Sequence, residues 1–338
     1  MATFFEIGVE ERLKNNQLLK LSELIDWKRI EKLLKKVHLR DESKAPGEEG
    51  YNKLSMFKAI LLGQWHSLSD PKLEEALRVR LDFMRFTGFS LEEAIPDETT
   101  LCRFRNKLIT RNLDKALLRE VNQELERLGL KVERAEAAVV DATIISSAAR
   151  PKKVIEMSMD REEEPMSTKE NFEIVESADK DARWLKKGKK SYYGYKGYIA
   201  TDSKEGYIVH ADATPANTAE VSEFADFTEG LQANRILGDK GYASRSNREK
   251  LKARGIKDGI MHKAVKGKEL RSSQKLFNKL VSKQRYIVEQ AFGTLKRKFR
   301  FDRASYFGLR KMQAQLMFKA MCFNLNKALN KQTRLAHI

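Results

Sequence analysis

The hydrophobic pattern of this chain changes its period once, near residue 131, and that change limits the folds available to it. Before this point apolar residues recur at the three- and four-residue steps of helices, as at Leu18, Leu21, Leu24 and Ile25. The run "AEAAVVDATIISS" that follows is short, apolar and rich in β-branched residues, which is typical of a buried strand. We therefore expect an all-helical domain over residues 1–130, an α/β domain over 131–310 and a basic C-terminal helix over 311–338.

The order of elements after residue 131 predicts a mixed α/β fold. The first strand precedes a charged segment, near 150–185, that has few apolar residues and that we expect to be a mobile loop. The stretch "SYYGYKGYIATDSKEGYIVHADATPAN" then predicts a hairpin of two strands with its turn at Ser203 to Gly206. A helix, the strands "RILGDKGYAS" and "IKDGIMHKA", and a long helix over 273–300 complete the expected domain. Its apolar side is predicted to be Leu276, Leu280, Ile287, Val288, Ala291, Phe292 and Leu295.

In the helical part, "GFSLEEAIPDETTLCRFRNKL" predicts one helix that ends at Gly88 and a second that begins after Asp97. Two helices joined in this way resemble a helix-turn-helix. The second helix carries four basic residues, Arg103, Arg105, Lys107 and Arg111. These side chains either contact DNA or form the solvated face of an ordinary bundle helix, and the sequence favours neither interpretation.

The charge of the chain indicates a polyanionic partner. It has 65 Lys and Arg against 48 Asp and Glu, a formal net charge of +17 and a pI near 9.6. Nucleic acid is the first candidate, because the sequence has no lipidation signal, no signal peptide and no run of eighteen apolar residues. We expect no membrane contact and a cytoplasmic location. Cys102 and Cys322 lie far apart without nearby histidines, so neither a zinc site nor a disulfide is predicted.

Two aspartates lie at positions where a carboxylate either costs free energy to bury or is expected to bind a ligand. Asp141 lies within the apolar run "VVDATII", where an ionised side chain costs several kcal/mol unless a positive group such as a metal ion meets it. Asp239 follows the apolar "RIL" on an open turn, at the end of a strand where ligand sites form in α/β sheets. Either residue taken alone is better interpreted as a turn-capping or surface aspartate.

Glu289 is the only acidic residue between Leu270 and Phe301, in an otherwise basic segment. At about 100° per residue it shares one stripe of the predicted helix with Ser282, Arg285 and Lys296, beside the apolar face. A metal ion could reach it there. The alternative is a surface ion pair with Arg285 worth less than about 1 kcal/mol.

Together these residues resemble the signature of the DDE transposases of the insertion-sequence 5 family. The resemblance rests on Asp141 in "VVDATIISSAARPKK", Asp239 in "RILGDKGYAS" and the spacing of Arg285, Glu289 and Lys296. The segments "GYKGYIATDS", "ATPAN" and "PDETTLCRFRNKL" are similar to that family too, so the resemblance covers nearly the whole chain. The family has a tyrosine where this chain has Ser282, so no role is carried over to that position.

The resemblance implies an RNase H-like catalytic domain that cuts and joins DNA at the ends of a mobile element. It implies that Asp141, Asp239 and Glu289 are the catalytic residues and bind two Mg²⁺ ions, for which Mn²⁺ substitutes. Such a pair of ions activates the attacking oxygen and stabilises the leaving oxygen, and hard carboxylate oxygens suit it. The implied partners are double-stranded DNA, both as terminal inverted repeats and as target, and a second copy of the chain in a synaptic complex.

Further residues are candidates for contact with DNA. We expect Arg285 and Lys296 to hold phosphates beside Glu289, within a tail from Val281 that has thirteen Lys and Arg and two acids. Its other expected contacts are Arg297, Lys298 and Arg300. Trp184 and Tyr242 either stack on unpaired bases or serve packing and surface roles. His66 and His210 are interpreted as structural.

Two other classes of protein remain compatible with the sequence. An RNase H-like nuclease that only hydrolyses DNA would share the three acids. A DNA-binding regulator derived from a transposase would need none of them, so their presence argues against it.

Overall fold

The computed structural model describes residues 11–35, 50–90, 92–149, 151–155, 172–175 and 177–335. Its N-terminal part is helical, as predicted. The helices are α2 (Gln17–Leu24), α3 (Lys28–Leu34), α4 (Lys53–His66), α5 (Asp70–Val79), α6 (Leu81–Thr87), α7 (Glu98–Thr110) and α8 (Leu113–Arg127). The predicted boundaries are confirmed, because Gly88 caps α6 with φ of 85° and the Asp97 side chain accepts a hydrogen bond from the Thr100 backbone N–H at the start of α7.

The sheet follows and is mixed, with both antiparallel and parallel pairs of strands. Its strands are β1 (Ala135–Ser146), β4 (Arg183–Lys187), β5 (Lys190–Asp202), β6 (Ile208–Pro215), β7 (Ala233–Gly238) and β8 (Lys257–Ile260). The antiparallel strands β6, β5 and β1 lie side by side, β7 pairs parallel to β1, and β8 pairs parallel to β7. Strand β4 pairs with the first residues of β5.

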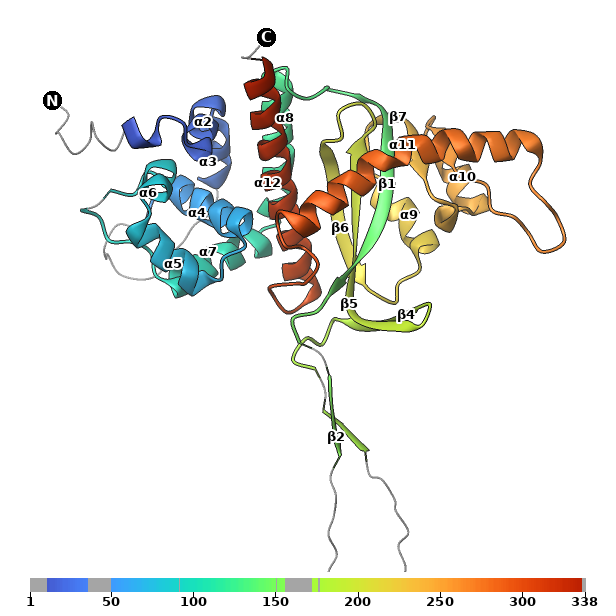
Figure 1. Ribbon diagram of the computed structural model, residues 1–338, viewed down its shortest axis with the longest axis horizontal. Coiled ribbons are helices and arrows are strands. Elements are labelled where there is room, and N and C mark those ends of the chain that lie inside the picture. The colour runs from blue at the N-terminus through green and yellow to red at the C-terminus, as the bar shows by residue number, and fades with distance from the viewer. Residues whose placement is uncertain are drawn as a thin grey trace, which may run out of the picture.

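Helices cover both faces of this sheet. They are α9 (Glu220–Thr228), a short 3-10 helix (Lys240–Tyr242), α10 (Arg245–Ala253), α11 (Ser272–Arg297) and α12 (Leu309–Leu335). Figure 1 shows α11 crossing one face of the sheet, while α9 and α10 lie behind it. Alternating strand residues supply the two cores: Val139 faces the core beneath α11 and α12, whereas Val140 faces the core shared with α9.

Helix α12 does not form the separate basic C-terminal helix that we expected. It lies between the N-terminal helices and the sheet (Figure 1), and most of its length is buried in one continuous core that runs from Leu18 to Ala328. Even Lys319 is buried, where its Nζ donates hydrogen bonds to the carbonyls of Phe299 at 2.6 Å and Gln64 at 3.2 Å. The tail from Val281 is therefore not one uninterrupted surface for a polyanion.

Helix α11 has nearly the predicted length, but only part of its predicted apolar side is buried. Val288 and Leu295 are buried as expected, whereas Leu276 and Leu280 are 59% and 55% exposed. Figure 1 gives the reason, because the N-terminal half of the helix extends past the edge of the sheet. The helical period alone cannot tell where the supporting surface ends.

Part of the segment predicted to be a mobile loop forms strands. Strands β2 (Lys152–Ile155) and β3 (Phe172–Val175) form a two-stranded antiparallel sheet, and residues 156–171 lie outside the described residues. The end of the segment is tightly held by Asp179, which is fully buried. Its carboxylate accepts hydrogen bonds from Ser147 Oγ at 2.5 Å, Tyr195 OH at 2.5 Å and the Gly308 N–H at 2.9 Å. Among the described residues, no helix is both long enough and apolar enough to cross a bilayer.

Candidate active site

The three candidate carboxylates come from β1, β7 and α11. Because β1 and β7 are parallel and pair Val139 with Leu237, residues two positions further along, Asp141 and Asp239, stand side by side at one end of the pair. Asp239 follows the last residue of β7, and its carboxylate accepts a hydrogen bond from the Lys240 N–H at 2.6 Å. Glu289 lies on α11, which packs across β1, β5 and β7, and its side chain is 60% exposed.

The guanidinium of Arg285 lies among all three carboxylates. Its Nη2 is 3.2 Å from Asp141 Oδ1 and 3.9 Å from Glu289 Oε1, and its Nη1 is 3.7 Å from Asp239 Oδ1. These distances are longer than the 2.7–2.9 Å of a tight charge-assisted hydrogen bond. The arrangement is therefore an electrostatic cluster: three acids share one cation that is mostly buried, and the Arg285 Nε has no hydrogen-bond partner among the described residues.

Burial makes the Asp141 carboxylate costly. Burial is the main cause that raises the pKa of Asp141 to about 6; Arg285 and a hydrogen bond from the Ala142 N–H oppose the rise, while Asp239 and Glu220 add to it. One guanidinium does not compensate fully for this concentration of negative charge. A cation of higher charge placed between the carboxylates would favour the ionised form.

A divalent metal ion suits these residues in chemistry. Three carboxylates are hard oxygen donors of the kind that Mg²⁺ and Mn²⁺ prefer, and no histidine or cysteine is needed. Yet within the described part of the chain no three acidic, histidine or cysteine side chains are already grouped closely enough to hold a metal. Because the Arg285 guanidinium stands between the carboxylates, it would have to withdraw before they could share an ion.

Lys296 extends the site along β1. Its Nζ donates a 2.6 Å hydrogen bond to Thr143 Oγ1, and Thr143 lies two residues after Asp141 on the same face of the strand. Burial is the main cause that lowers the pKa of Lys296; Asp302 raises it and Lys187 lowers it. Lys296 therefore contacts the face of β1 that also carries Asp141, and its contact with DNA stays a prediction.

The basic residues after Lys296 have different surroundings. Lys298 donates to Asn326 Oδ1 at 2.5 Å and lies 5.7 Å from the centre of the Trp65 ring, so it ties α11 to α12. Arg297 is exposed and donates to the Gly293 carbonyl, and Arg300 is exposed with a φ of 50°. Arg297 and Arg300 remain open to solvent, and their contact with DNA stays a prediction.

The prediction that Arg105 contacts DNA is wrong. Arg105 is 4% exposed and makes two hydrogen bonds to the Asp70 carboxylate, at 2.6 and 2.7 Å. Its guanidinium also lies 4.2 Å from the centre of the Tyr306 ring, so it connects the N-terminal helices to the segment between α11 and α12. On the same helix Arg103 is exposed and Lys107 is half-buried. Contact of these two side chains with DNA stays a prediction.

Tyr242 does not stack on bases, because it is fully buried with its ring 5.2 Å from that of Phe224. Trp184 is 48% exposed, and its ring lies 5.2 Å from that of Tyr193. The histidines fit their structural interpretation: His66 packs on Phe83 and His210 on Phe227. Both cysteines are free.

Sequence reasoning missed Glu220, which lies close enough to raise the pKa of Asp141. It is the first residue of α9, and its carboxylate is 3.6 Å from the Nζ of buried Lys196. Lys196 in turn donates to the Thr218 carbonyl at 2.7 Å. Nothing in the sequence around Glu220 distinguishes it from a surface acid in the first turn of a helix.

Comparison with known proteins gives consistent matches. Residues 132–325 match the family of transposase DDE domains, and residues 8–107 match a transposase domain family known as DUF772. The transposase for insertion sequence element IS1106 of Neisseria meningitidis serogroup B is 46% identical over 231 residues, which are 68% of this chain and 77% of that protein.

Two solved structures are also similar. The first is the piggyBac transposase synaptic complex with hairpin DNA, with a TM-score of 0.48 and 10% identity over 96% of this chain and 77% of that one. The second is the Mos1 transposase paired-end complex with the left transposon end, with a TM-score of 0.21 and 12% identity over 83% of this chain and 88% of that one.

Proposed function

This chain belongs to the family of DDE transposases, and from that membership we propose that it binds the ends of an insertion sequence, cuts them and joins them to target DNA at the site of Asp141, Asp239 and Glu289. The observation that carries the assignment of the site is the convergence of these three carboxylates on the Arg285 guanidinium. They come from positions as far apart as residues 141 and 289. An ion pair at the surface would need one acid, whereas metal-dependent transfer needs several.

DDE transposases use divalent metal ions, and here we propose two Mg²⁺ ions, for which Mn²⁺ substitutes. When bound, such a pair supplies Lewis-acid stabilisation of the attacking and leaving oxygens. In our proposal Asp141, Asp239 and Glu289 hold these ions. Asp141 and Asp239 come from paired strands of the sheet core, which fixes their relative position before DNA arrives.

Arg285 and Lys296 complete the proposed chemistry. Arg285 lies among the three acids, and if they were to hold metal ions instead, its guanidinium would be available to pair with a DNA phosphate beside them. The Lys296 ammonium, fixed by Thr143, would hold a second phosphate along β1. In the proposed sequence water attacks the phosphorus at the element end and the P–O3′ bond breaks, which leaves a 3′-hydroxyl and a 5′-phosphate. The 3′-hydroxyl then attacks a phosphodiester of target DNA at the same residues, and the 3′-oxygen of the target strand leaves.

The proposed partners are double-stranded DNA and a second copy of this chain. The piggyBac and Mos1 structures named above are complexes with DNA. We propose that residues 1–130 contact the terminal repeats through the exposed side of α7, where Arg103 lies, and that two copies hold the two ends in one synaptic complex.

A strand-transfer assay tests this function. Full-length protein would be incubated in Mg²⁺ with labelled duplexes from the ends of its element and with a supercoiled target plasmid. We expect joined products from the wild type and none from Asp239→Asn. Hydrolysis without joining would favour the nuclease, and binding without cleavage would favour the DNA-binding regulator.

A further inference from the structure

The hairpin formed by β4 and the start of β5 carries unusually concentrated positive charge. Five exposed cations stand within eight residues: Arg183, Lys186, Lys187, Lys189 and Lys190. No acidic residue occurs from 182 to 201. Within the part of the chain that the structure describes, no carboxylate lies within ion-pair distance of the four lysines. The hairpin therefore bears a local charge that the described structure does not neutralise.

The register of the hairpin makes this charge costly for folding. Lys187 pairs directly with Lys190 across the two strands. Like charges placed opposite each other in an antiparallel pair are destabilising. A polyanion lying along the hairpin would remove this repulsion, so the hairpin is better suited to a bound state than to the free one.

The hairpin also has an aromatic surface. Trp184 is nearly half exposed, and it pairs in register with Tyr193, with their rings 5.2 Å apart. Tyr193 itself is buried, so it supports the exposed Trp184 ring from beneath. An exposed aromatic ring among cations suits the sugars and bases of nucleic acid as well as its phosphates. Figure 1 shows the hairpin reaching out from an end of the sheet, clear of the covering helices.

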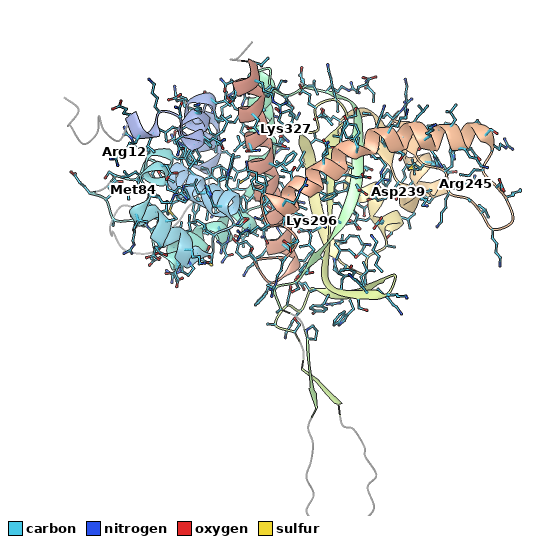
Figure 2. The ribbon with its side chains drawn as sticks, in the orientation of Figure 1. Arg12, Met84, Asp239, Arg245, Lys296 and Lys327 are labelled. Carbon is cyan, nitrogen blue, oxygen red and sulfur yellow. The ribbon has the colours of Figure 1, made fainter. Side chains whose placement is uncertain are left out.

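The catalytic face continues into this hairpin. Strand β5 pairs Ile199 with Asp141 and Gly194 with Ser146, and then carries on to Lys190. Lys296, one of the side chains labelled in Figure 2, is bonded to Thr143 of the same face and is close enough to Lys187 for its pKa to be lowered by that charge. DNA that reaches the acids can therefore extend over both Lys296 and the hairpin.

We propose that the hairpin of β4 and β5 is a basic finger that grips the DNA backbone beside the scissile phosphate. The proposal rests on the proposed function, and it assigns to Lys186, Lys187, Lys189 and Lys190 a role that the catalytic acids do not supply. Lys190 lies nine residue steps before Ile199 on β5, which is at most about 30 Å along an extended strand. At about 3.4 Å per nucleotide, the finger contacts phosphates within roughly nine nucleotides of the cleaved bond.

The test replaces Lys187 and Lys190 together by glutamine in the full-length protein. Binding to an element-end duplex would be measured as a function of salt, in EDTA to prevent cleavage. If each lysine neutralises one phosphate, the salt slope falls by about 1.8 and affinity at 0.1 M salt falls by roughly 60-fold. The control is Lys250→Gln with Lys252→Gln on α10, both of which are exposed, and we expect it to change binding little.

Two further measurements separate a contact with DNA from a structural role. The melting temperature of the double variant should stay the same or rise, because the cross-strand repulsion is gone. Duplexes with a single neutral methylphosphonate within nine nucleotides of the cleavage site should bind the wild type more weakly, without weakening the variant further.

Other outcomes would overturn the proposal. Lysines on an edge strand also prevent sheets from associating. If the lysines serve only to prevent such association, the double variant would self-associate in sedimentation experiments and bind DNA with an unchanged salt slope. An equal loss in the control on α10 would show that only net charge matters. Wild-type protein that neither binds nor cuts element ends would refute the proposed function itself.

Discussion

Neutralising Glu289 separates metal binding from the ion pair that its sequence context also permits. The Glu289 side chain is 60% exposed, and its one described ion pair is with Arg285 at 3.9 Å, one helical turn away. An exposed pair of this kind contributes less than about 1 kcal/mol, and Gln has nearly the helix propensity of Glu. We therefore expect Glu289→Gln to change the free energy of unfolding by less than about 1 kcal/mol, which shifts the melting temperature by at most about 2–4 °C.

Activity should respond very differently from stability. If Glu289 holds a metal ion, its loss misplaces the charge that stabilises the transition state, and cleavage in Mg²⁺ should fall by about 100-fold or more. DNA affinity should hold or rise slightly, because a negative group beside the phosphates is removed. Cleavage and binding would be measured on the same element-end duplex, with thermal melts to verify folding.

The chain offers a matched control for this experiment. Glu249 is 61% exposed and also pairs with an arginine one turn earlier on its helix, Arg245, at 2.7 Å. Glu249→Gln should have a similar small effect on stability and none on cleavage. Near-normal cleavage by folded Glu289→Gln, or an equal loss in Glu249→Gln, would show that Glu289 is only a surface ion-pair partner.

Three other predictions concern stability. Without metal, Asp141→Asn should raise the free energy of unfolding at pH 8 by up to about 3 kcal/mol, because burial raises the pKa of this carboxyl from 3.8 to about 6. The wild type should therefore lose stability as pH rises from about 4 to 6, whereas urea titrations of the variant should lack that loss. Gly194→Ala should lower the melting temperature sharply, since its Cβ would lie 2.1 Å from the Ile145 carbonyl oxygen, while Gly230→Ala, with open space around it, should not. A fragment of residues 1–130 should show no cooperative melting transition, because its core is completed by α12, whereas full-length protein should melt in one main transition.

Much of the fold was predictable because its signals are local. The change of hydrophobic period marked the start of the sheet at β1, and Gly88 and Asp97 marked helix ends through their own backbone and capping preferences. Asp141 could be singled out because a carboxylate in an apolar run is costly without a partner, Asp239 because it follows a strand on an open turn, and Glu289 because it is alone in a basic segment. Only the resemblance to DDE transposases joined the three into one site. The sequence also shows the cluster of lysines in the hairpin of β4 and β5. Only the register of the two strands shows that Lys187 and Lys190 lie opposite each other.

What the sequence by itself determined was which segments become helices and strands and which residues can do chemistry. Only the tertiary structure decided which surfaces meet. From the sequence, Arg105 was interpreted as a surface cation, but in the fold it pairs with Asp70. The segment of α12 was interpreted as a basic tail, but both halves of the chain pack around it. The position of Arg285 beside Asp141 and Asp239 likewise depends on the packing of α11 against β1 and β7. The physical reason is that burial and charge pairing depend on distances between residues remote in sequence, which no local pattern encodes.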